Sequence, residues 1–149
     1  MILHIQNCSG IKNVPTLTEF KRWISTTLRI LKAMNRKTEL TLRLVTEKES
    51  QQLNRQFRGK NKPTNVLSFP ATTTEHTSDY LGDLAICVAV VKVEARSQHK
   101  TIKSHFAHMI VHGTLHLLGY DHQHKTEASK MEKLEIEILT KLSFENPYE

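Results

Sequence analysis

The stretch His112-Gly113-Thr114-Leu115-His116-Leu117-Leu118-Gly119-Tyr120-Asp121-His122 places three histidines at positions i, i+4 and i+10. Two histidines four residues apart lie on one face of a helix, about 6 Å apart along its axis. Gly119 follows the second histidine by three residues, and glycine readily adopts the left-handed conformation that ends a helix. The spacing therefore predicts a helix that stops at a glycine turn, after which the chain brings the third histidine back to the first two.

Three imidazoles that converge on one point are a typical ligand set for a catalytic zinc ion. Such a site leaves the fourth coordination position to water, whereas a structural zinc site is closed by a fourth protein ligand, usually cysteine. The two cysteines, Cys8 and Cys87, are distant from the histidines in the sequence. We therefore predict that His112, His116 and His122 bind one Zn²⁺. The alternative is a histidine-rich amphipathic helix that packs on a core without metal.

The same spacing matches the pattern H-E-x-x-H-x-x-G-x-x-H of the metzincin proteases at every position but one. Gly113 stands where that pattern has glutamate. In those proteases the glutamate is the general base that activates the zinc-bound water. Because glycine cannot transfer a proton, the sequence keeps the metal-binding pattern and lacks the peptidase base. This argues for a metal-dependent hydrolase of another kind.

A stripe of histidines continues down the same helical face and consists of His105, His108, His112 and His116. A His108/His112 ligand pair fits helical spacing, but it lacks a glycine turn and a third ligand at the matching distance. We expect His105 and His108 to line a groove or to support the ligands. Asp121 can orient a ligand imidazole or act as a base; the alternative is a turn residue that accepts hydrogen bonds from backbone amides.

The overall composition is that of an ordinary globular protein, with 149 residues, 38% hydrophobic and 24% charged. We expect a single domain over residues 1–149. No apolar run approaches membrane-spanning length, and Met1–Gln6 lacks the basic and apolar regions of a signal peptide, so we expect a cytoplasmic protein with free thiols. The net charge of +6 suits a polyanionic partner such as nucleic acid.

Hydrophobic periodicity and turn residues predict alternating strands and helices. Strands are expected over residues 1–6, 39–45, 65–69 and 83–87. Helices are expected over residues 16–34, from a capping box at Thr46–Glu49 to Gly59, over about ten residues ending at Gln98, over 103–118, and after a cap at Thr126. Residues 71–79 are expected to form a surface loop. This order predicts an α/β or α+β fold in which a small mixed sheet of about four strands packs with about five helices.

A second group of polar residues lies at the predicted end of the second helix. Four cations fall within eight residues: Arg55, Arg58, Lys60 and Lys62. A turn of this kind can present guanidinium and ammonium groups to phosphate oxygens. The alternative is a solvated basic turn that only complements the negative end of the helix.

Three motifs together resemble one known family. H-G-x-L-H-L-L-G-Y-D-H at 112–122, F-R-G-K-x-K-P-T-N-V-L-S-F-P at 57–70 and L-G-D-L-A-I at 81–86 are similar to the YbeY family of bacterial rRNA maturation factors and endoribonucleases. The similarity extends over nearly the whole chain in order and length. The second motif often has aspartate where this chain has Asn61 or Asn65, which is a minor departure.

The resemblance implies a zinc-dependent, single-strand-specific endoribonuclease of the bacterial cytoplasm with a zincin-like fold. It implies roles in maturing the 3′ end of the small-subunit ribosomal RNA and in ribosome quality control. The expected partners are single-stranded RNA and ribosomal or small-subunit assembly proteins, and neither DNA nor a membrane. Matched by motif position, His112, His116 and His122 are the zinc ligands, and Arg58 is the family's functional arginine.

The resulting mechanistic hypothesis gives catalytic roles to His112 and Arg58. Bound zinc would polarise a phosphate oxygen or lower the pKa of bound water to about 7, and Arg58 would neutralise charge on the phosphate. Arg55, Arg58, Lys60 and Lys62 are expected to bind the RNA. The general base, and the choice between water and the RNA 2′-OH as nucleophile, stay open. The rival functions are a zinc-stabilised, non-catalytic RNA-binding assembly factor and a metalloprotease.

Overall fold

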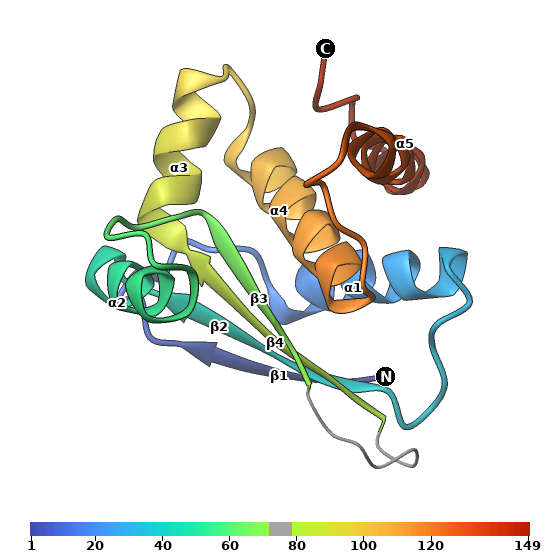
Figure 1. The fold of residues 1–149 in the computed structure, drawn as a ribbon, viewed down its shortest axis with the longest axis horizontal. Coiled ribbons are helices and arrows are strands. Elements are labelled where there is room, and N and C mark those ends of the chain that lie inside the picture. The colour runs from blue at the N-terminus through green and yellow to red at the C-terminus, as the bar shows by residue number, and fades with distance from the viewer. Residues whose placement is uncertain (72–78) are drawn as a thin grey trace.

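A computed structural model describes residues 1–71 and 79–149 of the chain (Figure 1). Its strands form one sheet in the order β1-β2-β4-β3. The first three of these pair in parallel, and β3 runs antiparallel to β4. The strands are β1 (Ile2–Asn7), β2 (Glu39–Val45), β3 (Val66–Pro70) and β4 (Tyr80–Cys87). The helices are α1 (Leu17–Ile30), α2 (Glu47–Arg58), α3 (Val88–Ser97), α4 (Ile102–Leu117) and α5 (Lys125–Lys141).

This mixed sheet and its helices confirm the predicted fold class. The alternating residues Leu40, Leu42 and Leu44 of β2 are buried in the main core, as the sequence pattern predicted. Side chains of α1, α4 and α5 complete that core. Because neighbouring residues of a strand point to opposite faces, Ala85 and Cys87 of β4 lie on the other face, in a smaller cluster beside α2. The sheet thus separates α2 from α4.

Helix α4 lies unusually close to the sheet at Gly113. A Cβ atom at this position would come within 2.9 Å of Leu84 Cδ2 and 3.1 Å of Val66 Cγ2. The Ser68 hydroxyl also donates a hydrogen bond to the Gly113 carbonyl at 2.9 Å. Residue 113 therefore faces the sheet, and a glutamate there would have to displace core side chains.

Two predicted helix boundaries were wrong. The first helix, predicted over 16–34, begins after the Thr16 capping box but ends at Ile30, and Lys32 has a φ of +53°. The apolar pattern continues past the helix because residues of the following turn also pack on the core. The last helix is preceded by His124, which makes no side-chain cap, so Thr126 lies inside the helix and does not cap it.

The structure also differs from the sequence predictions at one helix cap and at the ends of two strands. The Thr46 hydroxyl accepts a hydrogen bond from the Glu49 N–H, but the Glu49 carboxylate is bound by Arg43, so the predicted box is only half formed. Strand β4 begins at Tyr80, three residues before the predicted start, and β3 extends from Val66 to Pro70. Most of the loop predicted over 71–79, residues 72–78, lies outside the described residues.

Candidate metal centre

The three predicted ligands converge at the end of α4. The helix ends at Leu117, and Gly119 has a φ of +95°, as the glycine turn required. The ring centroids of His112 and His116 lie 4.6 Å apart, and that of His122 lies 5.5 Å and 5.0 Å from them. One ligand nitrogen from each ring lies within 4.8 Å of the others. The turn has therefore brought the third imidazole to the first two.

This donor set fits a divalent metal ion. Ligand nitrogens about 2.0–2.1 Å from a tetrahedral zinc ion are separated by about 3.3 Å. The Nε2 atoms of His112 and His116 lie 3.1 Å apart, close to that separation. His122 is exposed, so the third side of the group opens to solvent. A metal held by these three imidazoles would keep a position free for water or substrate. The assignment of the three residues as ligands stays a prediction.

The carboxylate of Glu135, on α5, holds His112 in place. Glu135 Oε1 accepts a hydrogen bond from Nδ1 of His112 at 2.9 Å, and the Glu135 side chain is only 1% exposed. A carboxylate only accepts, so Nδ1 carries the proton and Nε2 is left with the lone pair that a metal needs. Burial by itself raises the pKa of Glu135, but the hydrogen bonds from His108 and His112, and the positive charge that these rings carry when protonated, outweigh it and lower the pKa to about 2.

Sequence reasoning missed Glu135, although a signal was present. It lies four residues after Met131 and three before Ile138, both on the predicted core face of the last helix. A carboxylate on an apolar face is unusual, because an ionised group is rarely buried without a partner. In a chain with a predicted metal-binding helix, a carboxylate at that position indicates a group that orients one of the metal ligands.

The other two histidines of the α4 stripe, His108 and His105, each contact a carboxylate inside the protein. His108 Nε2 lies 2.5 Å from Glu135 Oε2, so His108 shares the carboxylate with His112. His105 Nε2 lies 2.9 Å from Glu94 on α3, which also accepts hydrogen bonds from Asn65. Both histidines are buried, which favours a supporting role over an exposed groove lining. His108 acts directly on the group that orients His112.

The surroundings of His116 favour its neutral form. Burial lowers the pKa of His116, and the neighbouring His112 and His122 lower it further, which favours the neutral imidazole that binds metal.

Asp121 accepts hydrogen bonds from the backbone N–H groups of His122 and Gln123 at 2.6 Å and 3.2 Å. Of the roles considered for Asp121, the structure favours the turn residue.

The basic turn lies at the end of α2 and leads into β3, whose Ser68 hydroxyl is hydrogen-bonded to Gly113 of α4. Gly59 has a φ of +69° and ends the helix, and the Asn54 amide donates to the Lys62 carbonyl at 2.8 Å. The four predicted RNA-binding cations are exposed. Within residues 1–71 and 79–149, no hydrogen bond or ion pair joins their side chains to the triad. The roles of Arg55, Arg58, Lys60 and Lys62 therefore stay predictions.

Comparisons with known proteins agree with the motif resemblance. A family model described as "Endoribonuclease YbeY" matches residues 4–143. A relative named Endoribonuclease YbeY from Coxiella burnetii is 46% identical over 148 residues, which covers 99% of this chain and 97% of the relative. Another of that name, from Colwellia psychrerythraea, is 46% identical over 149 residues, covering 99% and 96%. The solution structure of TM1509 from Thermotoga maritima is 28% identical with a TM-score of 0.57, covering 93% of this chain and 91% of that one. The chain belongs to the YbeY family.

Proposed function

We propose that this chain is a zinc-dependent endoribonuclease that cleaves single-stranded RNA at the histidine triad. The observation that carries the proposal is the convergence of His112, His116 and His122, with a buried carboxylate behind His112, in a chain of the YbeY family. When bound, zinc supplies a Lewis acid that stabilises charge on a phosphoryl oxygen and makes bound water more acidic.

The chain's own residues bind and orient the substrate. Glu135 fixes the ring of His112 so that its Nε2 faces the site. The guanidinium of Arg58 carries a permanent charge in a fork that matches phosphate oxygens, and it neutralises charge as the transition state forms. Lys60, Lys62 and Arg55 hold flanking phosphates. A flexible single strand can follow these cations to the triad more easily than a stiff duplex.

The proposed cellular context follows from the family. We propose one domain over residues 1–149 that acts in the cytoplasm on ribosomal RNA, at the 3′ end of the small-subunit RNA and in ribosome quality control. Ribosomal or small-subunit assembly proteins would guide it, and neither DNA nor a membrane is an expected partner. The net charge of +6 supports an RNA partner. Among the described residues no helix is both long enough and apolar enough to cross a bilayer.

A second candidate function is a non-catalytic RNA-binding assembly factor in which zinc only stabilises the fold. The observation that favours it is the position of His122, three residues before α5 begins at Lys125. A metal on the triad would clamp the end of α4 to the start of α5, and metal binding of this kind adds to the free energy of folding.

Chelation separates the two functions. EDTA should abolish cleavage of a labelled single-stranded RNA while leaving RNA affinity and the far-UV circular dichroism spectrum largely intact, and added Zn²⁺ should restore cleavage. Cleavage that continues in EDTA would contradict catalysis by the metal, whereas loss of the fold on chelation would favour a structural metal. The product ends identify the nucleophile, because a 2′,3′-cyclic phosphate forms only when the 2′-OH attacks.

A further inference from the structure

The segment after α5, residues 143–149, folds back along α4 and is fixed at three points. The Phe144 ring packs edge-on against Trp23, with the centroids 5.9 Å apart. The Lys100 ammonium donates a hydrogen bond to the Pro147 carbonyl at 2.6 Å. The Tyr148 hydroxyl donates to Glu135 Oε2 at 2.7 Å. The last of these contacts joins the segment to the carboxylate that orients His112.

The carboxylate of Glu135 receives three donors. His112 binds Oε1, and His108 and Tyr148 both bind Oε2. The ring of Tyr148 also packs edge-on against that of His108, with the centroids 5.4 Å apart. Two donors on one oxygen fix the plane of the carboxylate, so that the other oxygen stays in line with Nδ1 of His112. Tyr148 is 47% exposed as a residue, so it forms the boundary between this buried network and solvent.

We propose that Tyr148 is a positioning residue of the metal centre, which it stabilises through Glu135 and His112. This inference rests on the proposed metal site. It adds Tyr148, which contacts Glu135, to the pair formed by Glu135 and the proposed ligand His112. Outer hydrogen-bond partners of a metal-bound histidine typically change metal affinity by 10–100-fold when they are removed. Because His108 still binds Oε2 when the tyrosine hydroxyl is removed, we expect an effect of about tenfold, at the lower end of that range.

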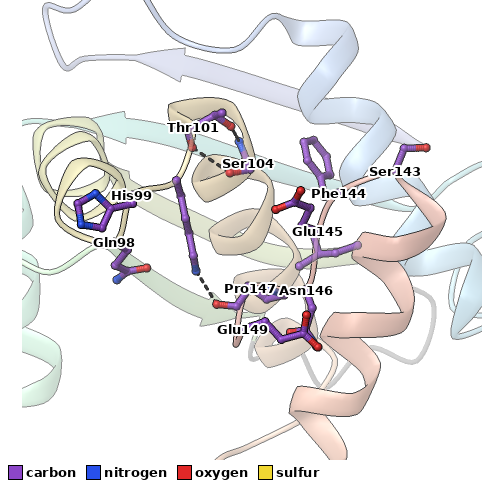
Figure 2. Close-up of a pocket in the computed structure, with 12 residues that line it drawn as sticks. Gln98, His99, Thr101, Ser104, Ser143, Phe144, Glu145, Asn146, Pro147 and Glu149 are labelled. Carbon is purple, nitrogen blue, oxygen red and sulfur yellow. Dashed lines mark hydrogen bonds between the residues drawn. The ribbon is translucent and has the colours of Figure 1, made fainter.

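Lys100 helps to position Tyr148, because it binds the carbonyl of the preceding residue, Pro147. It lies in the α3–α4 connection, and Figure 2 shows the hydrogen bond that ends at the Pro147 carbonyl. A cavity of about 330 Å³ lies between that connection and the 143–149 segment, so little side-chain packing holds the segment at this side. The Lys100 hydrogen bond fixes the backbone directly before Tyr148, together with the hydrogen bond that the Tyr148 N–H donates to Asn146 Oδ1 at 2.8 Å. If Lys100 acts on the metal only through Tyr148, removing both should cost no more than removing Tyr148.

The test is the Zn²⁺ affinity of the metal-free protein of residues 1–149, measured by competition with a chromophoric chelator. Tyr148→Phe removes the hydroxyl and keeps the ring. Tyr80→Phe is the matched control, since the Tyr80 hydroxyl also donates to a carboxylate, that of Asp83, on the other face of the sheet. We expect Tyr148→Phe to bind Zn²⁺ about tenfold more weakly than wild type and Tyr80→Phe to bind as wild type does. The visible spectrum of the Co²⁺ form should change in Tyr148→Phe alone, which a purely structural role would not cause.

The variants at Lys100 complete the test. Lys100→Met should weaken Zn²⁺ binding in the same direction, and the double variant Lys100→Met/Tyr148→Phe should bind no more weakly than Tyr148→Phe. Equal Zn²⁺ affinity in wild type and Tyr148→Phe would overturn the inference and leave the proposed function intact. Equal weakening in Tyr148→Phe and Tyr80→Phe would also overturn it. A wild-type protein that binds no Zn²⁺ would overturn the proposed metal site itself.

Discussion

Glu135 on α5 accepts a hydrogen bond from Nδ1 of His112 on α4 at 2.9 Å, across 23 residues of sequence. This contact selects the tautomer of His112 whose Nε2 faces His116 and His122. It also explains why a carboxylate is buried in the apolar face of α5, because three donors surround it. The packing of the last helix on the histidine helix is therefore part of the candidate metal centre.

Replacing Glu135 by glutamine should weaken metal binding strongly. Glutamine keeps the shape but loses the charge, and its NH₂ group cannot accept from a histidine N–H. We expect a 10–100-fold loss of Zn²⁺ affinity, measured by chelator competition. Glu137→Gln, an exposed carboxylate on the same helix, is the control and should bind as wild type does. Wild-type affinity in Glu135→Gln would show that the carboxylate does not orient a ligand.

Substitutions at Gly113 should show a graded loss of stability. Alanine favours a helix by about 1 kcal/mol over glycine. This gain offsets overpacking at the lower end of its usual 1–3 kcal/mol, so Gly113→Ala should lie within about 1 kcal/mol of wild type. Gly113→Val adds two further methyl groups against Leu84 and Val66, and we expect a loss of about 2–3 kcal/mol. Urea unfolding measures both, and equal stability of the two variants would contradict the close helix–sheet contact.

The metal-free protein should lose stability as the pH falls below about 6.5. Burial lowers the pKa of His105 from its usual 6.5, the charges of His108 and Lys100 act in the same direction, and the Glu94 hydrogen bond opposes them. The unfolded chain therefore binds more protons than the folded one just below pH 6.5, and the free energy of unfolding falls as the pH falls.

A variant at His105 tests this assignment. His105→Gln should show a smaller fall in the free energy of unfolding between pH 7.5 and pH 5.5 than wild type, whatever its stability at the higher pH. Part of the fall will remain, because burial also lowers the pKa of His116. Urea titrations at several pH values give both slopes. If the two proteins lose stability in parallel, burial of His105 does not penalise its charged form.

The basic turn should contribute mainly salt-dependent affinity for RNA. Each phosphate contact by a cation changes the slope of log affinity against log salt by about 0.7 for a single strand. Replacing both Lys60 and Lys62 with glutamine should therefore reduce the slope by about 1.4. The control is the pair Lys12→Gln and Lys37→Gln, which removes the same charge from exposed positions outside the turn. An equal change of slope in both double variants would mean that the turn contributes to RNA affinity only through the net charge of the protein.

The sequence predicted the local features of the site and missed those that depend on long-range packing. The convergence of His112, His116 and His122 follows from helical spacing and one glycine turn, so it could be predicted within eleven residues. Glu135 and Tyr148 reach the site only because α5 and the following segment pack against α4. That packing has no local signature apart from a carboxylate on an apolar helix face.

The difference between local sequence patterns and long-range packing also explains which parts of the fold were predicted wrongly. Strand β2 was predicted correctly because its alternating leucines, from Leu40 to Leu44, face one core. The first helix was predicted too long because Leu31 and Met34 pack on that core from a turn, and helical periodicity does not distinguish the two. The cap at Thr126 was wrong because a suitable residue type does not fix where a helix begins.

The most direct test of the proposed function compares three purified proteins on one labelled single-stranded RNA, with the zinc content of each sample determined. Wild type should cleave the RNA and contain about one zinc ion per chain. His116→Ala should lose both zinc and cleavage, and Arg58→Glu should lose cleavage and keep its zinc. Equal cleavage by all three proteins would contradict catalysis at the triad and would indicate a contaminating nuclease.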